Sequence, residues 1–520
     1  MTIFPYHRWA LIVAIGGFLF GFDATMISGV IGFVTREFGL SDWQIGLVVA
    51  APTLLGIPAS LTVSTLADRF GRKRILLLLA ILYGVSAVWS ALAQDFWALV
   101  IARAVGGYAF GSLGLAPIYI SEIAPSDSRG RLVSFNQLNI VVGFSIAYFA
   151  SYAVLQLSQS HAPWVTAVAL NTHPWRHMLA LEALPAIVWF GLLLRVPESP
   201  RWLALQGRTQ EAFAVFSRYL QPQEAQKLIE EVRQQEPMRP LLDRIKFVIR
   251  PRFHTVLLIG VVLAVAQQIT GINAVYFYAA TIFQQAGFGT DAAFAQAILI
   301  GIVNVVFTVI AMALIDRIGR KPLLMIGMIT MTVSMAVIGY GFSQARYELS
   351  PGRAAELAGQ LKIRDLSSLG GRVFTREVDF RQALRATVTP TEYTARQAEI
   401  MQSAIKLKPL LILFGILAFV AGFAVSIGPV MWVMLPEILP NAVRGVGMAM
   451  VGSMNSIVSF GVQFLFPIQI GTVGNAATFA AYAAAGAVFT LLIARVVPET
   501  RGRTLEQLEN DLTRGKQPAK

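Results

Sequence analysis

Three short charged motifs occur twice in this chain in the same order, and long apolar segments separate them. The pairs are Asp-Arg-Phe-Gly-Arg-Lys at 68–73 with Asp-Arg-Ile-Gly-Arg-Lys at 316–321, Glu-Ile-Ala-Pro at 122–125 with Glu-Ile-Leu-Pro at 437–440, and Pro-Glu-Ser at 197–199 with Pro-Glu-Thr at 498–500. Two copies of one membrane bundle explain this order, and internal repeats of this kind are common in transport proteins.

The apolar segments are long enough to cross a bilayer as helices. Charged residues make up 14% of the chain, against about 25% in soluble proteins, and the apolar runs reach the roughly 20 residues that a spanning helix needs. The period-two alternation of barrel strands is absent. We therefore predict an all-α membrane protein of two pseudo-symmetric six-helix bundles. The expected spans are near 9–32, 43–66, 74–93, 96–119, 132–154, 176–196, 254–278, 293–315, 322–342, 409–433, 446–467 and 476–497.

Basic residues gather in one set of short loops. Loops 67–73 and 316–321 each hold three Lys or Arg residues, whereas the opposite loops 33–42 and 279–292 hold one and none. By the positive-inside rule the first set is cytoplasmic, and so are both termini. This pattern predicts a multi-pass protein of a cell (inner) membrane. Because the net charge of +13 belongs to these loops, we expect no nucleic-acid partner.

The motif spacing divides the chain. We predict an N-terminal bundle at 1–197, cytoplasmic linker helices at 198–250, a C-terminal bundle at 251–497 and a cytoplasmic tail at 498–520. The first motif pair is 248 residues apart and the second 315, so the second half has gained about 67 residues. The polar segment 343–408, with eleven Lys or Arg residues, supplies them as an extracytoplasmic insertion. Within it, 353–361 and 391–405 have helical patterns, and no function is assigned to it.

Two charged residues are expected inside the membrane. Asp23 lies in the middle of the first span and Arg103 near the start of the fourth. A lone charge there costs several kcal/mol, and pairing an acid with a base lowers that cost. A proton-coupling site is one interpretation of the pair, and a static ion pair is the other. Glu182 in the sixth span is a second acid, for which packing or gating is the simpler role.

Uncharged polar residues recur in the spans of both halves. Gln137, Gln267, Gln268, Asn273, Asn304 and Asn455 bear amides, and Trp432 adds an aromatic ring. Amides donate and accept hydrogen bonds, which suits a neutral ligand rich in hydroxyl groups, and an aromatic face suits the apolar side of a sugar ring. One amide alone is more simply an interhelical hydrogen bond. Their number favours a shared central cavity.

The repeated loop motifs predict a cytoplasmic gate. Carboxylates there can interact with helix N-termini and arginines, and glycines permit tight turns. The Glu and Arg residues seven apart in both halves are candidates for ion pairs between the halves that hold one access state and break in the other. The gating residues are Asp68, Arg69, Gly71, Arg72, Glu122, Arg129, Glu198, Asp316, Arg317, Gly319, Arg320, Glu437, Arg444 and Glu499.

Chemistry on a bound group is not expected. The chain has no cysteine and five histidines, and the histidines lack metal-ligand spacing. No nucleophile–base pair or phosphate-binding loop stands out. We predict no metal, no cofactor and no enzymatic activity.

These motifs resemble those of the sugar porter family of the major facilitator superfamily. The resemblance rests on the paired Asp-Arg-x-Gly-Arg-Lys loops, Pro-Glu-Ser-Pro-Arg at 197–201, Gln267-Gln268 through Asn273, and Pro-Glu-Thr-Arg-Gly at 498–502. It implies an alternating-access carrier with the major facilitator fold. We expect the chain to function as a monomer in the lipid bilayer. The sugar contacts that it implies are Phe20, Gln137, Gln267, Gln268, Asn273, Asn304, Trp432 and Asn455.

The resemblance also bears on coupling. Proton-coupled members have an acid where this chain has Asp23, and Arg103 matches the arginine that pairs with it, so the resemblance implies proton-coupled symport of a monosaccharide or polyol. Ser456, where many members have Trp, and Phe277, where members have Tyr, depart from the family pattern and leave the sugar open. A facilitative uniporter is the alternative of the same class, and a membrane sugar sensor is the alternative of another class.

Overall fold

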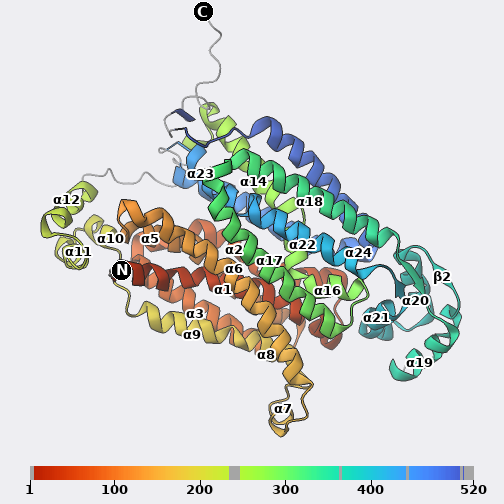
Figure 1. Ribbon diagram of the computed structural model, residues 1–520. Coiled ribbons are helices and arrows are strands. Elements are labelled where there is room, and N and C mark those ends of the chain that lie inside the picture. Colours follow the sequence, from red (N-terminus) through yellow and green to blue (C-terminus); the bar gives the residue numbers. More distant parts are fainter. Residues whose placement is uncertain are drawn as a thin grey trace, which may run out of the picture.

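The computed structural model describes residues 5–233, 246–361, 363, 366–440, 444–503 and 507–508. Part of the predicted linker, at 234–245, and most of the predicted tail lie outside these residues. Every predicted span is helical, as a single helix, as two or three consecutive helical segments, or as one part of a longer helix (Figure 1). The spans of the first half are α1 (Pro5–Phe38), α2 (Asp42–Phe70), α3 (Arg72–Leu92), α4 (Phe96–Ala109) with α5 (Ser112–Ile123), α6 (Ser126–Ser158), and α8 (Pro174–Leu181) with α9 (Ala183–Leu193).

The second half repeats this arrangement. Its spans are α14 (His254–Ile269) with α15 (Ile272–Phe277) and α16 (Ala279–Gln285), α17 (Thr290–Ile318), α18 (Arg320–Ser343), α22 (Pro409–Val425) with α23 (Ile427–Ile438), and the two parts of α24 (Arg444–Val496). Gly474, with φ 81° and ψ 169°, interrupts α24, so α24 supplies the last two of the twelve spans. The first half also has a short helix, α7 (Pro163–Ala167), before α8.

Several spans are broken near their middle. The seventh span breaks at Gly271, whose φ of 93° is left-handed, a conformation that favours glycine. A Cβ atom at this position would lie 2.9 Å from the Tyr482 ring. The tenth span breaks at Ser426, between α22 and α23. Broken helices expose backbone groups inside the bundle, which membrane proteins tolerate where other groups or a cavity satisfy them.

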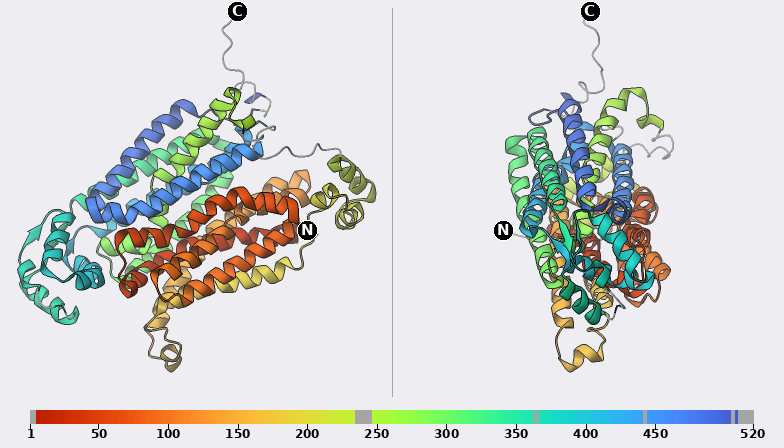
Figure 2. Two further views of the ribbon diagram at one scale, coloured as in Figure 1. Left: turned by 180° about the vertical axis from the view of Figure 1, so that it is seen from behind. Right: turned by 90° about the vertical axis from the view of Figure 1, so that its right-hand side faces the viewer.

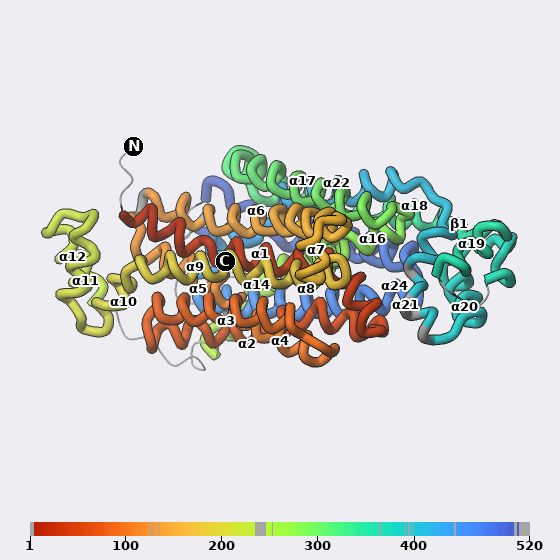
Figure 3. The backbone as a smooth tube through the Cα atoms, turned by 90° about the horizontal axis from the view of Figure 1, so that it is seen from below, coloured from red at the N-terminus to blue at the C-terminus, as the bar shows by residue number. Residues whose placement is uncertain are grey.

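The two ends of the bundle differ. The linker helices α10 (Pro200–Leu205), α11 (Thr209–Phe216) and α12 (Pro222–Arg233) lie at one end, here named the linker end. The segment 343–408 lies at the opposite end, here named the insertion end (Figures 2 and 3). The 3-10 turn η1 (Pro251–Phe253) leads into α14.

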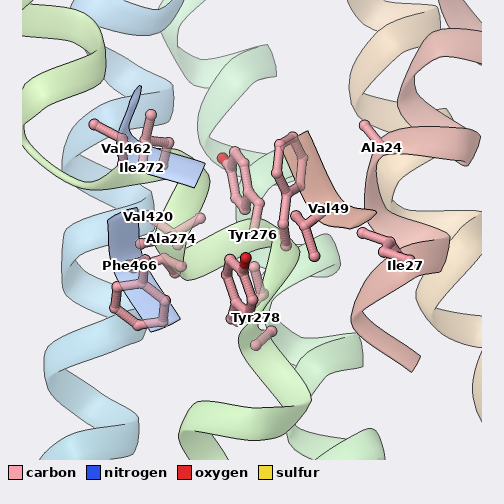
Figure 4. Close-up of a cluster of buried hydrophobic side chains, with 14 of the residues drawn as sticks. Ala24, Ile27, Val49, Ile272, Ala274, Tyr276, Tyr278, Val420, Val462 and Phe466 are labelled. Atoms are coloured by element: carbon pink, nitrogen blue, oxygen red, sulfur yellow. The ribbon is translucent and has the colours of Figure 1, made fainter. Parts of the chain in front are cut away.

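One apolar core joins the halves at the insertion end. From the first half it takes only side chains nearest that end, and it combines them with most of the second half. Ala24, Ile27 and Val49 lie opposite Tyr276 and Tyr278 in this core (Figure 4). The linker-end part of the first half has a separate core, which it shares with the linker helices and with none of the described residues of the second half. The halves are therefore packed together at the insertion end.

Segment 343–408 folds around a small core of its own. Its elements are β1 (Arg346–Glu348), α19 (Pro351–Leu361), η2 (Ser367–Leu369), β2 (Val373–Phe374), α20 (Glu377–Thr387), α21 (Pro390–Ala404) and β3 (Ile405–Lys406). The strands form an antiparallel sheet in the order β2-β1-β3. The two predicted helices are present as α19 and α21. The strands were not predicted, because two or three residues are too few to show a period.

Candidate functional site

The intramembrane acid and base form an ion pair. Asp23 of α1 and Arg103 of α4 are almost completely buried, with side chains 7% and 2% exposed, and Asp23 Oδ1 lies 3.4 Å from the guanidinium. Arg103 also donates from Nε to the carbonyl oxygen of Val48 at 3.0 Å. The arginine is thus held by the backbone of α2 independently of Asp23, so protonation of the acid would leave Arg103 with a partner.

Glu182 is the third charged group of this cluster. It lies at the junction of α8 and α9 and is buried, close enough to interact electrostatically with Asp23 and Arg103. Its Oε1 atom is buried without a hydrogen-bond partner among the described residues. Two carboxylates and one guanidinium would leave an uncompensated negative charge in the membrane, which is costly. One proton on this cluster would remove that charge. The structure thus brings Glu182 nearer to the Asp23–Arg103 pair than the sequence suggested.

Four of the predicted substrate residues form one hydrogen-bonded network. Gln267 Oε1 accepts from Asn455 at 2.8 Å and from Gln268 at 3.2 Å. Gln268 donates to Asn455 Oδ1 at 3.0 Å and accepts from Asn273. The network therefore draws on α14, α15 and α24, and we name these four residues the amide cluster.

The hydrogen bonds of the amide cluster leave mainly acceptors free. The amide groups of Gln267 and Asn455 also donate to backbone carbonyl oxygens, and Asn273 Nδ2 donates to Ser459 Oγ at 2.6 Å. Each side-chain NH2 group thus has protein acceptors for both of its hydrogens. Asn273 Oδ1 accepts no hydrogen bond from a described residue, and it keeps contact with solvent. The cluster is therefore set to accept hydrogen bonds from hydroxyl groups.

The other predicted contacts lie apart from this network. Phe20 of α1 packs edge-on against Phe110 at 4.7 Å and near Phe144 at 6.1 Å. Trp432 of α23 is 40% exposed, so its ring is open to a ligand or to lipid. Gln137 is half-buried and Asn304 is buried, and neither side chain has a hydrogen bond to another described residue.

The sequence analysis missed two polar residues that extend the network. Ser459 accepts from Asn273, and Gln463 donates to Ser459 Oγ at 2.7 Å. Both are buried on α24, where Asn455, Ser459 and Gln463 are four residues apart. This spacing puts them on one helix face, so extending the search by one and two turns from Asn455 would have found them.

The first charged-motif set forms a single ion-paired assembly at the linker end. Arg72 contacts Glu122 at 2.9 Å and Asp68 at 2.9 Å. Glu198 accepts from the backbone N–H of Lys73 at 3.0 Å, at the start of α3, where the helix dipole favours an anion. The carboxylate at this helix N-terminus is therefore that of Glu198, whereas Asp68 pairs with an arginine.

The second set repeats this assembly. Arg320 contacts Glu437 at 2.8 Å and Asp316 at 3.1 Å. Glu499 accepts from the backbone N–H groups of Arg320 and Lys321 at 3.1 and 3.0 Å. Although partial burial of Glu499 opposes ionisation, these hydrogen bonds, with others from the backbone of Arg501 and Thr500, lower the pKa of its carboxyl group below the ordinary value.

Glycine is required at the matching turns. Gly71 and Gly319 have φ angles of 102° and 104°, in the region that side chains strain to enter. A Cβ atom at Gly71 would collide with the Glu198 carboxylate, and one at Gly319 would lie 2.8 Å from Glu499 Oε2. The same two glycines therefore permit the turn and the close approach of the carboxylate.

The remaining gating residues make no ion pair between halves among the described residues. Arg69 stacks on Phe70 at 5.2 Å, and Arg444 donates to the Leu439 carbonyl oxygen at 3.3 Å. Among the described residues, Arg129 Nε is buried without a partner and Arg317 forms no ion pair. Glu122 and Glu437 instead pair within their own halves. Ion pairs across the halves stay a prediction for the other access state.

Comparisons with known proteins cover nearly the whole chain. The family described as "Sugar (and other) transporter" matches residues 9–352 and 389–512, which omits 353–388 of the insertion. The arabinose-proton symporter of Bacillus subtilis is 34% identical over 501 residues, covering 95% of this chain and 92% of that protein. The D-xylose-proton symporter of Escherichia coli is 30% identical over 534 residues, covering 96% and 94%.

Solved structures agree with these relatives. The chain is similar to the xylose transporter of Escherichia coli in a partially occluded inward-open conformation, with a TM-score of 0.72, 29% identity and coverage of 96% of this chain and 99% of that one. Its TM-score to the same transporter bound to a brominated deoxyglucose is 0.67, with 29% identity and 97% and 98% coverage. The predicted fold of two six-helix halves is thereby confirmed.

Proposed function

Because this chain belongs to the sugar (and other) transporter family, we propose that it is a proton-coupled symporter that carries a monosaccharide or polyol by alternating access. It is a multi-pass membrane transporter, and a secondary active one. Relatives that are symporters of arabinose and of xylose support a sugar as substrate.

The buried Asp23–Arg103 pair carries the proton-coupling proposal. Charged groups inside a membrane bundle are expensive to bury, and where they occur they commonly mark ion or proton pathways. Here Glu182 adds a second acid without adding a base. Protonation of this cluster would neutralise its surplus charge and loosen Asp23 from Arg103. The halves would then be free to rearrange around bound sugar, and both ligands would leave together.

The amide cluster supports a central sugar site. Its free acceptors suit the hydroxyl hydrogens of a sugar, with Gln137, Asn304, Phe20 and Trp432 as further wall residues. Several hydrogen bonds to one neutral ligand give recognition without charge. We propose these eight residues as the substrate site, and the gating residues as a cytoplasmic gate at the linker end.

The positions of the linker helices and of the insertion at opposite ends of the bundle support one orientation of the protein in the membrane. We propose that the linker end and both termini are cytoplasmic and that the insertion lies outside a bacterial inner membrane. In that orientation the structure is closed outside, in keeping with its likeness to an inward-open relative. We further propose the domain limits 1–197, 198–250, 251–497 and 498–520, the insertion 343–408, and function as a monomer.

Coupling to one proton would support a substantial gradient. A proton crossing 100 mV releases about 2.3 kcal/mol. At about 1.4 kcal/mol for each factor of ten, this sustains roughly fifty-fold accumulation of a neutral sugar.

The test is uptake of a labelled sugar and polyol panel into proteoliposomes, with and without an inward proton gradient. The wild type is expected to accumulate one or more substrates against their gradient, and Asp23→Asn to exchange them without accumulation. Asp379→Asn, which neutralises an exposed acid of the insertion, is the matched control and should accumulate normally. Equilibration alone in the wild type would leave a uniporter, and no flux from folded protein would leave a sensor.

A further inference from the structure

Gln463 connects the amide cluster to the other half of the molecule. Its Oε1 accepts from Thr53 Oγ1 of α2 at 3.0 Å, and its Nε2 donates to Ser459 Oγ at 2.7 Å. The Gln463 backbone carbonyl oxygen also accepts from the Tyr278 hydroxyl at 2.9 Å. Gln463 is 1% exposed, so these contacts fix its side chain.

The contacts of Ser459 orient its hydroxyl group. Ser459 Oγ accepts one hydrogen bond from Asn273 and one from Gln463. A hydroxyl group has two acceptor lone pairs and one hydrogen, so both lone pairs are occupied. The remaining hydrogen has no acceptor among the described residues. It is therefore a donor directed away from both amides and available to a ligand at the cluster, where the free groups are otherwise acceptors.

The bond to Thr53 depends on how the halves meet. Other hydrogen bonds join the halves, from Ser145 to the Gly301 carbonyl oxygen, from Tyr148 to the Tyr276 carbonyl oxygen and between Ser60 and Ser453. None of these ends on a residue of the amide network. Among the described residues, the Thr53–Gln463 bond is the only hydrogen bond that joins the first half to the amide cluster or to the residues that extend it, Ser459 and Gln463. Separation of α2 from α24 would therefore free the Gln463 side chain, and the Ser459 hydroxyl group would lose its fixed orientation.

We propose that Gln463 is a positioning residue for the sugar site. It holds the Ser459 hydroxyl as a hydrogen-bond donor to one sugar oxygen, and it does so fully only when Thr53 is in contact, with the insertion end closed. Sugar recognition and closure of that end are thereby linked through two uncharged side chains. This proposal rests on the proposed function, because it names a polar contact of the same site.

The experiment compares four variants in proteoliposomes that carry out sugar exchange. Gln463→Leu and Thr53→Val remove the two partners with little change in volume, and Thr53→Ser retains the donor. Ser60→Ala removes a different hydrogen bond between α2 and α24 and is the control. We expect a roughly three- to ten-fold rise in KM for Gln463→Leu and Thr53→Val, the size of one lost hydrogen bond, and wild-type KM for Thr53→Ser and Ser60→Ala.

Affinities for deoxy sugars distinguish a positioning role of Gln463 from a purely structural one, because a structural defect would weaken the binding of all analogues alike. Wild type should lose affinity for analogues lacking the oxygen that Ser459 contacts, and Gln463→Leu should no longer distinguish that analogue from the parent sugar. If the wild type transports sugar while Gln463→Leu and Thr53→Val keep both its KM and its analogue pattern, the positioning role is wrong and the proposed function stands. Absence of wild-type transport would instead overturn the proposed function. Should Gln463→Leu fail to fold, Thr53→Val alone decides the outcome.

A second inference concerns the insertion, which contacts both halves. Glu377 of α20 accepts from the backbone and side-chain N–H groups of Asn475 at 3.0 Å each, where the last part of α24 begins. Gln402 of α21 donates to the Phe288 carbonyl oxygen. These contacts anchor the insertion to the second half. Toward the first half, Glu399 of α21 pairs with Arg36 at the end of α1 at 3.1 Å.

From these contacts we infer that the insertion is a clasp that favours closure of the insertion end. It is anchored to one half by the buried Glu377 and the half-buried Gln402, and it reaches the other half through an exposed ion pair. Asp42 at the start of α2 also lies in the field of Arg381 and Arg385 of α20. Separation of the halves at this end would break the contacts to α1 and α2 and leave those to α24 intact.

Spin labels test the clasp. The chain has no cysteine, so Gln94→Cys and Val473→Cys label one exposed position on each half at the insertion end. Adding Glu399→Gln should increase the population with a long label distance two- to five-fold, because an exposed pair contributes little. Glu356→Gln, which removes an ion pair within α19, is the control and should change nothing. An unchanged distance distribution in Glu399→Gln together with Arg36→Gln would overturn the clasp.

Discussion

At the scale of single residues, a few side chains and glycines occupy positions where other residue types would not fit or would not carry the same charge. Gly71 and Gly319 share a left-handed conformation and each receives a carboxylate where a side chain would start. Asp23, Arg103 and Glu182 form a three-charge cluster in which one proton settles the charge balance. In both cases the arrangement depends on a few specific groups, a glycine without a Cβ atom in the first and ionisable side chains in the second.

Gly71→Ala should destabilise the transporter. The new methyl group would meet the Glu198 carboxylate in a backbone conformation that alanine rarely adopts, so we expect a loss of about 1–3 kcal/mol. Gly114→Ala is the matched control, since a Cβ atom there meets nothing within 4 Å. Thermal unfolding in detergent, followed by tryptophan fluorescence, measures both. Equal melting temperatures for the two variants would contradict the expected strain.

The Glu499 carboxylate should stabilise the fold in a pH-dependent way. Its pKa is lower in the folded chain than in the unfolded one, because backbone N–H groups bind the ionised form. The stabilisation is therefore fully present above the unfolded value of about 4.3 and is lost as the pH falls through the folded value. Glu499→Gln should melt below the wild type at pH 7, and the difference should shrink below pH 4. A difference that is constant from pH 7 to pH 3.5 would count against this assignment.

At the scale of elements, the spans and the insertion hold together by different means. The spans pack through apolar side chains and close glycine contacts, whereas the insertion has its own core and fastens to α24 through one buried carboxylate. Glu377 pairs with Arg381 at 2.7 Å, and both side chains are less than a tenth exposed. Because burial opposes its charge while Glu377 favours it, the pKa of Arg381 stays raised.

Glu377→Gln should loosen the insertion. It would leave the Arg381 guanidinium buried without its acid, which costs about 3–5 kcal/mol. Hydrogen exchange of the whole chain should show faster exchange in 345–407 for this variant. Glu348→Gln, which removes an exposed pair with Lys406, is the control and should cost at most about 1 kcal/mol. Unchanged exchange in Glu377→Gln would show that the apolar core alone holds the insertion.

The sequence predicted the elements that long apolar runs and repeated motifs define. It did not predict features that depend on contacts between distant parts of the chain. Long apolar runs and duplicated motifs predicted twelve spans, and amides at 267, 268, 273 and 455 converge. The breaks inside spans, at Gly271 and Ser426, were not foreseen, because glycine and polar residues also occur in unbroken helices. Ser459 and Gln463 escaped notice because a lone hydroxyl or amide is ordinary in a helix, and the partner of Gln463, Thr53, is 410 residues away. The role of Glu198 at the start of α3 likewise needed the tertiary structure.

At the scale of the whole molecule, the two halves are packed together at one end of the bundle and not at the other. The halves share an apolar core at the insertion end, and at the linker end each half keeps its own ion pairs. The resemblance in conformation to an inward-open relative fits this asymmetry. Alternating access then requires the shared core to part at one end while the linker-end faces come together.

Spin labels at the linker end should report the converse motion. Phe70→Cys and Ile318→Cys are exposed and precede the two matching turns. A transported sugar with an inward proton gradient should shorten this distance in part of the population while the Gln94–Val473 distance lengthens. The Asp23→Asn variant should keep the sugar-dependent change and lose its dependence on the proton gradient. Motion at only one end would contradict a rocking of the two halves.

The insertion also has a practical consequence. A detergent micelle covers the membrane-spanning helices of a bundle like this one and leaves few features by which electron cryomicroscopy images can be aligned. Here a folded unit projects from one end of the bundle (Figure 2) and is fastened to it through Glu377 and Gln402. The chain therefore carries its own fiducial marker, and its conformers can be sorted without an added antibody fragment. Because Arg346 and Lys406 pair across adjacent strands, the same unit could be grafted as a cassette onto relatives that lack one.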